Sequence, residues 1–222
     1  MGREDEALSQ ARNNIDAWTR EIEGAGLDAI LVIVSGCGTT IKDYGFMLRN
    51  DPAYADKAAR VSASARDISE YLATLKLEDA RAPMPLTVAY HAACSLQHGQ
   101  KVLREPKDLL TKVGFEVKDV PEGHLCCSSA GTYNIMQPAL SEQLRARKIV
   151  NIEWLKPDVI AAGNIGCITQ LAAGTNVPDR AYSRIARLGD RRPASRAACR
   201  TRPAPGFRDL MLCRQTARTG CS

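Results

Sequence analysis

The sequence predicts an α/β protein made of βαβ modules, in which helices cover a parallel sheet. Short apolar strands alternate with amphipathic helices in its second half. A strand-to-turn pattern also occurs twice, which indicates an internal repeat. With 45% hydrophobic residues in 222, the chain can build a folded core. We expect two cysteine-rich repeats, over residues 1–78 and 79–177, with the first truncated, and then a disordered Arg-rich tail over 178–222.

The first repeat is predicted from helical spacing of apolar residues and from its breaks. Gly24 and Gly26 separate the first helix from a strand of six apolar residues. Asp51-Pro52 is a typical helix start and opens one long amphipathic helix. In chain order we expect a helix over 5–23, a strand over 29–34, a short helix over about 39–48, a long helix over 52–75 and a linker over 77–85.

The second repeat has the regular alternation of a parallel sheet. We expect strands over 86–90, 115–117 and 158–162, with helices over about 100–113 and 138–155. The carboxyl ends of parallel strands lie along one edge of the sheet, where ligands bind. Residues that follow these strands should therefore meet in space.

The repeat is clearest around two Gly-Cys steps. Asp28 precedes Cys37 by nine residues, and Asp158 precedes Cys167 by nine residues. Helices that contain Asn14 and Asn151 lie upstream of the two steps. If both copies are complete, the Cys pair of the first would fall before the first residue, so we expect the chain to begin inside a module.

Four cysteines follow the strands of the second repeat and indicate a metal site. Cys94 follows the first strand, Cys126 and Cys127 follow the second, and Cys167 follows the third. Adjacent cysteines form a strained disulfide, but their thiolates can reach different atoms of a polynuclear centre. Cysteine thiolates are the usual ligands of iron–sulfur clusters, so we predict such a centre.

Other interpretations remain open for the cysteines and histidines. A tetrahedral zinc site with His91 or His124 as a further ligand is one, although paired C-x2-C spacing is missing. Cys37 is a further candidate for cofactor binding, or else a small buried apolar residue. His91, His98 and His124 can hydrogen-bond to sulfur, ligate the metal, or simply pack or face solvent.

Charge and missing motifs exclude several functions. The net charge is +5, but residues 180–222 hold eleven Arg and two Asp, so residues 1–179 carry −4 and give no support for nucleic-acid binding. The sequence has no phosphate-binding glycine motif, so we predict neither flavin nor nicotinamide binding and no catalytic residue. It has no signal peptide and no apolar run of membrane-spanning length, so we expect a cytoplasmic protein with reduced thiols.

Three cysteine-containing segments stand out: His91-Ala-Ala-Cys94-Ser-Leu-Gln-His98, Cys126-Cys127-Ser-Ser-Ala-Gly-Thr-Tyr-Asn134 and Gly163-Asn-Ile-Gly-Cys167-Ile-Thr-Gln170. They resemble the second cysteine-rich module, known as CCG, of the glycolate oxidase iron–sulfur subunit family. Residues 1–45, with Ser35-Gly-Cys37-Gly, resemble the end of the first module. Two departures stand out: Ser128 replaces the Gly of C-C-G, and Gln170 stands where heterodisulfide-reductase-type modules have a second Cys.

The resemblance implies an electron-transfer subunit with a [4Fe-4S]-type cluster. Such a subunit does not bind substrate; it accepts electrons from flavin-containing glycolate oxidase subunits while glycolate is oxidised to glyoxylate. It can lie at the inner face of the membrane through that complex. The family's N-terminal ferredoxin-like cysteine runs are absent, so we expect a C-terminal fragment with little activity alone.

Several alternatives to this function remain. The chain can be a zinc-stabilised or metal-free interaction module, or the nonfunctional product of a truncated, frameshifted gene. Within the family, a lactate-utilisation or heterodisulfide-reductase-like subunit is the nearest alternative. The Arg-rich tail is either a basic extension or the result of a lost reading frame near residue 178.

Overall fold

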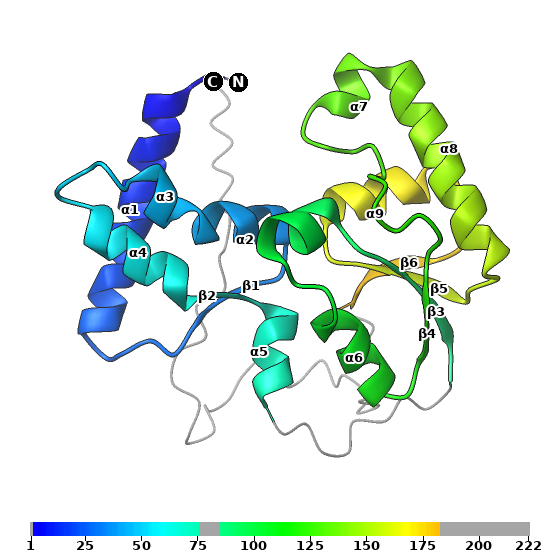
Figure 1. The fold of residues 1–222 in the computed structure, drawn as a ribbon, viewed down its shortest axis with the longest axis horizontal. Coiled ribbons are helices and arrows are strands. Elements are labelled where there is room, and N and C mark those ends of the chain that lie inside the picture. The colour runs from blue at the N-terminus through cyan, green and yellow to red at the C-terminus, as the bar shows by residue number, and fades with distance from the viewer. Residues whose placement is uncertain (1, 76–84, 183–222) are drawn as a thin grey trace, which may run out of the picture.

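The computed structural model describes residues 2–75 and 85–182, which we call the first and second lobes (Figure 1). The first lobe contains α1 (Glu4–Glu23), β1 (Ile30–Val32), α2 (Ser35–Lys42), α3 (Tyr44–Met47), α4 (Ala55–Ser64), β2 (Ala65–Asp67) and α5 (Ile68–Thr74). The second lobe contains β3 (Thr87–His91), the π-helix η1 (Ser95–Gln100), α6 (Glu105–Lys112), β4 (Glu116–Asp119), α7 (Tyr133–Met136), α8 (Pro138–Trp154), β5 (Val159–Ala162), α9 (Ile165–Ala172) and β6 (Asp179–Ala181).

Both sheets are parallel, which confirms the predicted α/β class. The second lobe has the strand order β4-β3-β5-β6, and Val88 of β3 pairs with Val117 on one side and Val159 on the other. All four residues of β5 are buried, as are the last four of β3. These strands form the core of the lobe together with Leu110, Ile152 and Leu171 from the covering helices.

The first lobe differs from the sequence prediction in two places. The short helix expected over about 39–48 is two helices, α2 and α3, and α2 already begins at Ser35. We expected a single helix over 52–75, but β2 interrupts it between α4 and α5. Ala65 and Asp67 pair with Ile30 and Val32 of β1 and are buried. Asp67 then caps α5 in a capping box with Glu70. The helical spacing continues across the break, so the apolar pattern alone conceals the strand.

The two copies of the repeat meet where their strands end. The order helix, strand, helix, strand is shared by α1-β1-α2-β2 and α8-β5-α9-β6, although the first copy also has α3 and α4 between α2 and β2. Just after β1, the Ser35 amide donates to the carbonyl oxygen of Gly163 at 3.0 Å. Just after β5, the side-chain amide of Asn164 donates to Ser35 Oγ at 3.2 Å. The loops that follow equivalent strands are therefore in direct contact.

The sheet continues beyond the point where we placed the start of the tail. Residues 179–181 form β6, because the Ile160 amide donates to the carbonyl oxygen of Pro178 and Ala162 pairs with Ala181. The next residue, Tyr182, is 1% exposed and donates from its hydroxyl to Asp67 Oδ1 at 2.5 Å. The rest of the predicted disordered tail, with Cys199, Cys213 and Cys221, lies outside the described residues, as does most of the predicted linker.

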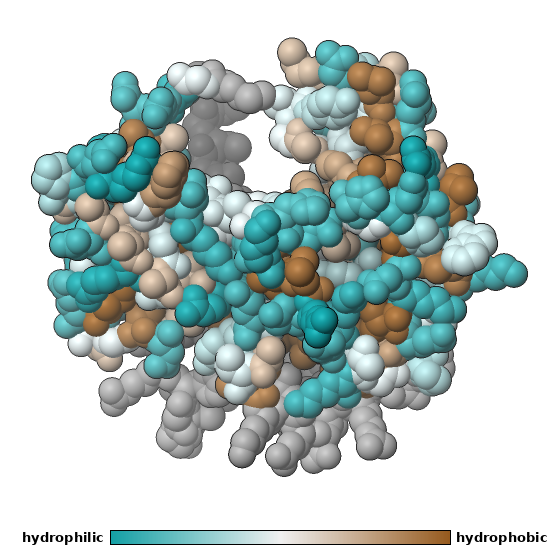
Figure 2. Space-filling view, in the orientation of Figure 1, coloured by the Kyte–Doolittle hydropathy of each residue, from teal (hydrophilic) through white to brown (hydrophobic). Residues whose placement is uncertain are grey.

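Large apolar side chains are exposed along α7 and α8. Figure 2 shows brown atoms of hydrophobic residues on this arm, at the upper right of the molecule. The exposed apolar side chains of α7 and α8 are Ile135, Met136, Leu140, Val150 and Trp154, each at least half exposed. Among the described residues, no helix combines the length and the apolar character needed to cross a membrane.

Candidate metal centre

The candidate centre lies at the carboxyl ends of three neighbouring strands. His91 is the last residue of β3, and Cys94 follows it directly before η1. Cys126 and Cys127 lie in the loop between β4 and α7, and Cys167 lies in the first turn of α9, after β5. Because β3 pairs with both β4 and β5, these loops emerge side by side at one edge of the sheet.

Three of these residues form a compact buried group. The ligand atoms of His91, Cys127 and Cys167 all lie within 4.8 Å of one another, and all three side chains are buried. The imidazole of His91 is 1% exposed, and neither ring nitrogen has a hydrogen-bond partner among the described residues. An imidazole and two sulfur atoms are a donor set that suits zinc or iron.

The remaining two predicted cysteines, Cys94 and Cys126, lie outside this compact group but close to each other. Burial raises the pKa of the Cys94 thiol, and the neighbouring Cys126 adds to the increase. Hydrogen bonding with Cys127, followed by burial, raises the pKa of the Cys126 thiol. The Ser128 amide donates to Cys126 Sγ at 3.2 Å. The thiol of Cys126 therefore influences the pKa of Cys94 and is itself influenced by Cys127.

A buried lysine, which the sequence analysis missed, accompanies the thiols. Lys148 of α8 is 1% exposed, and its Nζ donates to the carbonyl oxygen of Glu122 at 2.7 Å. Burial lowers the pKa of the ammonium group, while the charges of Cys127, Glu122, Cys126 and Cys167 act in the opposite direction. Its position was readable from the sequence, because it shares the buried helix face with Ile152, four residues further on.

Comparison with known proteins agrees with this geometry. Residues 88–172 match the cysteine-rich domain family CCG. These residues are a CCG cysteine-rich domain. The chain is 45% identical over 185 residues to the glycolate oxidase iron–sulfur subunit of Escherichia coli K12, an alignment that covers 83% of this chain and 45% of that protein. This similarity confirms the resemblance found in the sequence.

The chain is also similar to two other proteins. The probable glycolate oxidase iron–sulfur subunit of Bacillus subtilis 168 is 29% identical over 74% of this chain and 37% of its own length. Lactate utilization protein A of Geobacillus thermodenitrificans is 30% identical over 66% of this chain and 62% of its own length. The matched region thus spans less than half of the glycolate oxidase subunits and less than two thirds of the lactate protein.

The two departures from the CCG pattern are connected in space. Ser128 has φ 73°, a left-handed conformation that favours glycine, and this explains why a Gly is usual there. Its hydroxyl donates to the carbonyl oxygen of Ser141 at 2.6 Å and accepts from Gln170 Nε2 at 3.0 Å. Gln170 Nε2 also donates to Ser141 Oγ at 3.0 Å. Ser128 and Gln170, the two residues that depart from the CCG pattern, are therefore hydrogen-bonded to each other.

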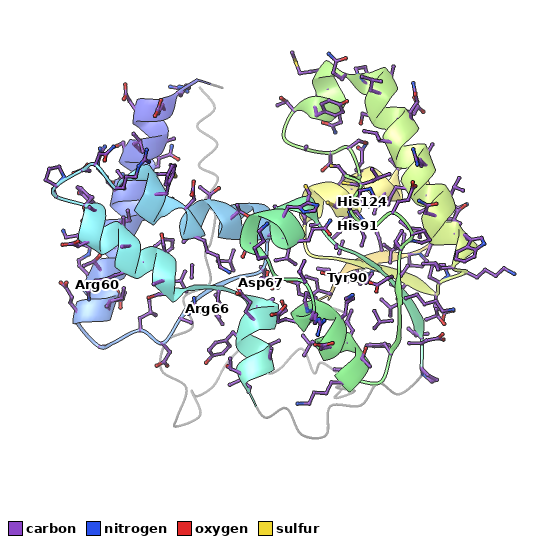
Figure 3. The ribbon with its side chains drawn as sticks, viewed as in Figure 1. Arg60, Arg66, Asp67, Tyr90, His91 and His124 are labelled. Atoms are coloured by element: carbon purple, nitrogen blue, oxygen red, sulfur yellow. The ribbon has the colours of Figure 1, made fainter. Side chains whose placement is uncertain are left out.

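The other predicted site residues lie apart from the buried group. Cys37 is half-buried in α2 and packs against the core of the first lobe. His98 is exposed on η1. His124 is exposed too, but it lines a pocket of about 280 Å³ together with His91, Gln97 and other residues of this edge. Figure 3 shows His91 and His124 near each other at the ends of the strands.

Proposed function

We propose that this chain is an iron–sulfur electron-transfer subunit of a glycolate oxidase type complex, with Cys94, Cys126, Cys127 and Cys167 holding a [4Fe-4S]-type cluster. One observation carries the proposal: two thiols and an imidazole from three strand ends gather at one edge of the CCG domain beside a buried cation. The similarity to glycolate oxidase iron–sulfur subunits supports it. When bound, a cluster of this kind supplies one-electron transfer.

The residues around the thiols have roles that fit this function. Burial of Cys127 and Cys167 keeps water from the sulfur atoms. The positive charge of Lys148 offsets negative charge on deprotonated thiolates, which would otherwise repel one another. These features stabilise an anionic centre in the protein interior. They provide no group for substrate chemistry, so we expect no turnover of glycolate by this chain alone.

The proposal includes partner subunits that carry flavin and oxidise the hydroxy acid. The exposed apolar residues of α7 and α8, Trp154 among them, support a protein contact on that arm, because large apolar patches are typical of interfaces. The proposed location is the cytoplasm, with contact to the inner face of the membrane through the complex.

Anaerobic reconstitution with iron and sulfide tests the proposal. The full chain should bind iron and acid-labile sulfide in comparable amounts and give an EPR signal after reduction. Cys127→Ser should lose most of the iron, whereas Cys37→Ser should keep it, because Cys37 packs against the core of the first lobe. An iron-free wild-type chain with all four thiols reduced would refute the proposal.

A mononuclear zinc site is the second candidate. The close grouping of His91, Cys127 and Cys167 favours it, because ligand atoms around one tetrahedral zinc ion lie roughly 3.5–3.8 Å apart. The chain would then be a zinc-stabilised interaction module. One equivalent of zinc retained through purification, with no iron uptake on reconstitution, would support this function over electron transfer.

A further inference from the structure

The environment of His91 is unusual for a structural histidine. The side chain is 1% exposed at the end of β3, and both ring nitrogens lack hydrogen-bond partners among the described residues. Buried polar groups in proteins are almost always hydrogen-bonded, so an imidazole with two unpartnered nitrogens indicates a missing ligand. In a neutral imidazole one nitrogen has a hydrogen to donate, and the other has a lone pair that a metal atom can accept.

Two thiols beside the imidazole favour a metal centre as that missing partner. A ring nitrogen of His91 lies within 4.8 Å of the sulfur atoms of both Cys127 and Cys167. Two neutral thiols are weak hydrogen-bond partners, whereas a metal centre can bind an imidazole and two thiolates with small movements of the side chains. Cys126 extends from the adjacent position toward Cys94, so the adjacent cysteines can serve two different metal atoms.

Gln170 is a poorer ligand candidate than His91, because its amide would have to bind a soft metal through a neutral oxygen atom. Both hydrogens of its side-chain amide nitrogen are engaged, one by Ser128 Oγ and one by Ser141 Oγ, each at 3.0 Å. The residue is 8% exposed, and the two serines that hold it are buried. An amide is also a poor ligand for soft metals compared with a thiolate or an imidazole.

We propose that His91 binds the metal centre directly, as a ligand beside Cys127 and Cys167, so that the centre has mixed cysteine and histidine ligation. The proposal rests on the proposed function and adds a ligand to the same site. A neutral imidazole carries one negative charge less than a thiolate. Histidine ligation therefore raises the reduction potential of an iron–sulfur centre relative to ligation by cysteine alone.

Isotope labelling tests this ligand without disturbing the fold. The chain has three histidines, so a His98→Ala, His124→Ala double variant, purified without a histidine tag, retains His91 as its only imidazole. Grown with ¹⁵N-histidine and reconstituted anaerobically, this variant should show a strong ¹⁵N coupling to the cluster in pulsed EPR. His91→Ala should lose the coupling, and His91→Cys should have a lower midpoint potential than wild type.

The outcomes separate this inference from the proposed function. Iron uptake without any histidine coupling in the double variant would overturn the inference and leave the proposed function in place. Zinc uptake without iron would overturn the proposed function. In that case at least tenfold weaker zinc binding in His91→Ala than in the double variant would support His91 as a ligand, and equal binding would overturn it. A chain that binds neither metal would overturn both.

Discussion

Replacement of Tyr182 by Phe tests the contact that joins the end of the sheet to the first lobe. The Tyr182 hydroxyl donates to Asp67 Oδ1 at 2.5 Å, and both residues are 1% exposed. A hydrogen bond to a charged group contributes about 1.5–3 kcal/mol. Asp67 Oδ1 keeps two donors from Ser69 after the change, so we expect a loss of about 2 kcal/mol in the free energy of unfolding.

The substitution isolates the hydroxyl because the ring stays in place. A methyl group added at Gly163 would lie 2.5 Å from Tyr182 Cε1, so the ring packs directly on the glycine backbone and Phe fills the same space. Burial and the charge of Asp67 raise the pKa of Tyr182, which keeps the hydroxyl protonated and able to donate. For a chain of this size, 2 kcal/mol corresponds to a decrease in Tm of about 4–8 °C.

Urea unfolding followed by circular dichroism measures the effect, and Tyr71→Phe is the control. Tyr71 is half-buried, and its hydroxyl has no hydrogen-bond partner within the described residues, so its loss should cost little. A double-mutant cycle with Asp67→Asn should show coupling between the two side chains. A Tyr182→Phe protein within about 0.5 kcal/mol of wild type would show that the hydroxyl contributes little, contrary to the usual strength of such a bond.

Three other changes have expected outcomes. In the reconstituted protein, Lys148→Met should lower the midpoint potential by roughly tens of millivolts, because a buried cation stabilises the reduced, more negative state of the centre. Redox titration measures this change, and Lys112→Met, at an exposed lysine, should leave the midpoint potential unchanged. Hydrogen bonding from Arg147 lowers the pKa of Glu122 from 4.5 to about 2, so its stabilising contribution is complete above pH 4.5 and lost as the pH falls toward 2. In Glu122→Gln, the free energy of unfolding measured in urea should vary less between pH 4.5 and 2 than in wild type. The same pH dependence in both proteins would contradict the lowered pKa of Glu122. Gln170→Leu should cost about 1–2 kcal/mol in unfolding free energy, since two buried serine hydroxyls lose their donor; equal stability in urea would argue against the network.

The overall fold was predictable because its strands and helices have distinct apolar periods. The strand predicted over 86–90 is β3 over 87–91, and the helix predicted over 138–155 is α8 over 138–154. The long helix predicted over 52–75 was wrong, because Ala65 and Asp67 satisfy a helical pattern while pairing with β1. The sequence does contain the correcting signal, a capping box formed by Asp67 and Glu70.

The candidate site was predictable only in part. The positions of Cys94, Cys126, Cys127 and Cys167 after consecutive strands indicated that their loops would be neighbours, since the ends of parallel strands share an edge. The sequence could not rank the three histidines, because each lies near a cysteine in the chain. Only the sheet shows that His91 ends a buried strand while His98 and His124 are exposed.

The pleat of β3 limits how this chain can vary in length. Tyr90 and His91 are consecutive, so their side chains leave opposite faces of the sheet: the phenol lies in the field of Asp67, and the imidazole lies beside Cys127 and Cys167. One inserted or deleted residue within the strand would move each ring to the opposite face of the sheet. A phenol would then face the sulfur atoms, so length variation is tolerable only in the loops that flank β3.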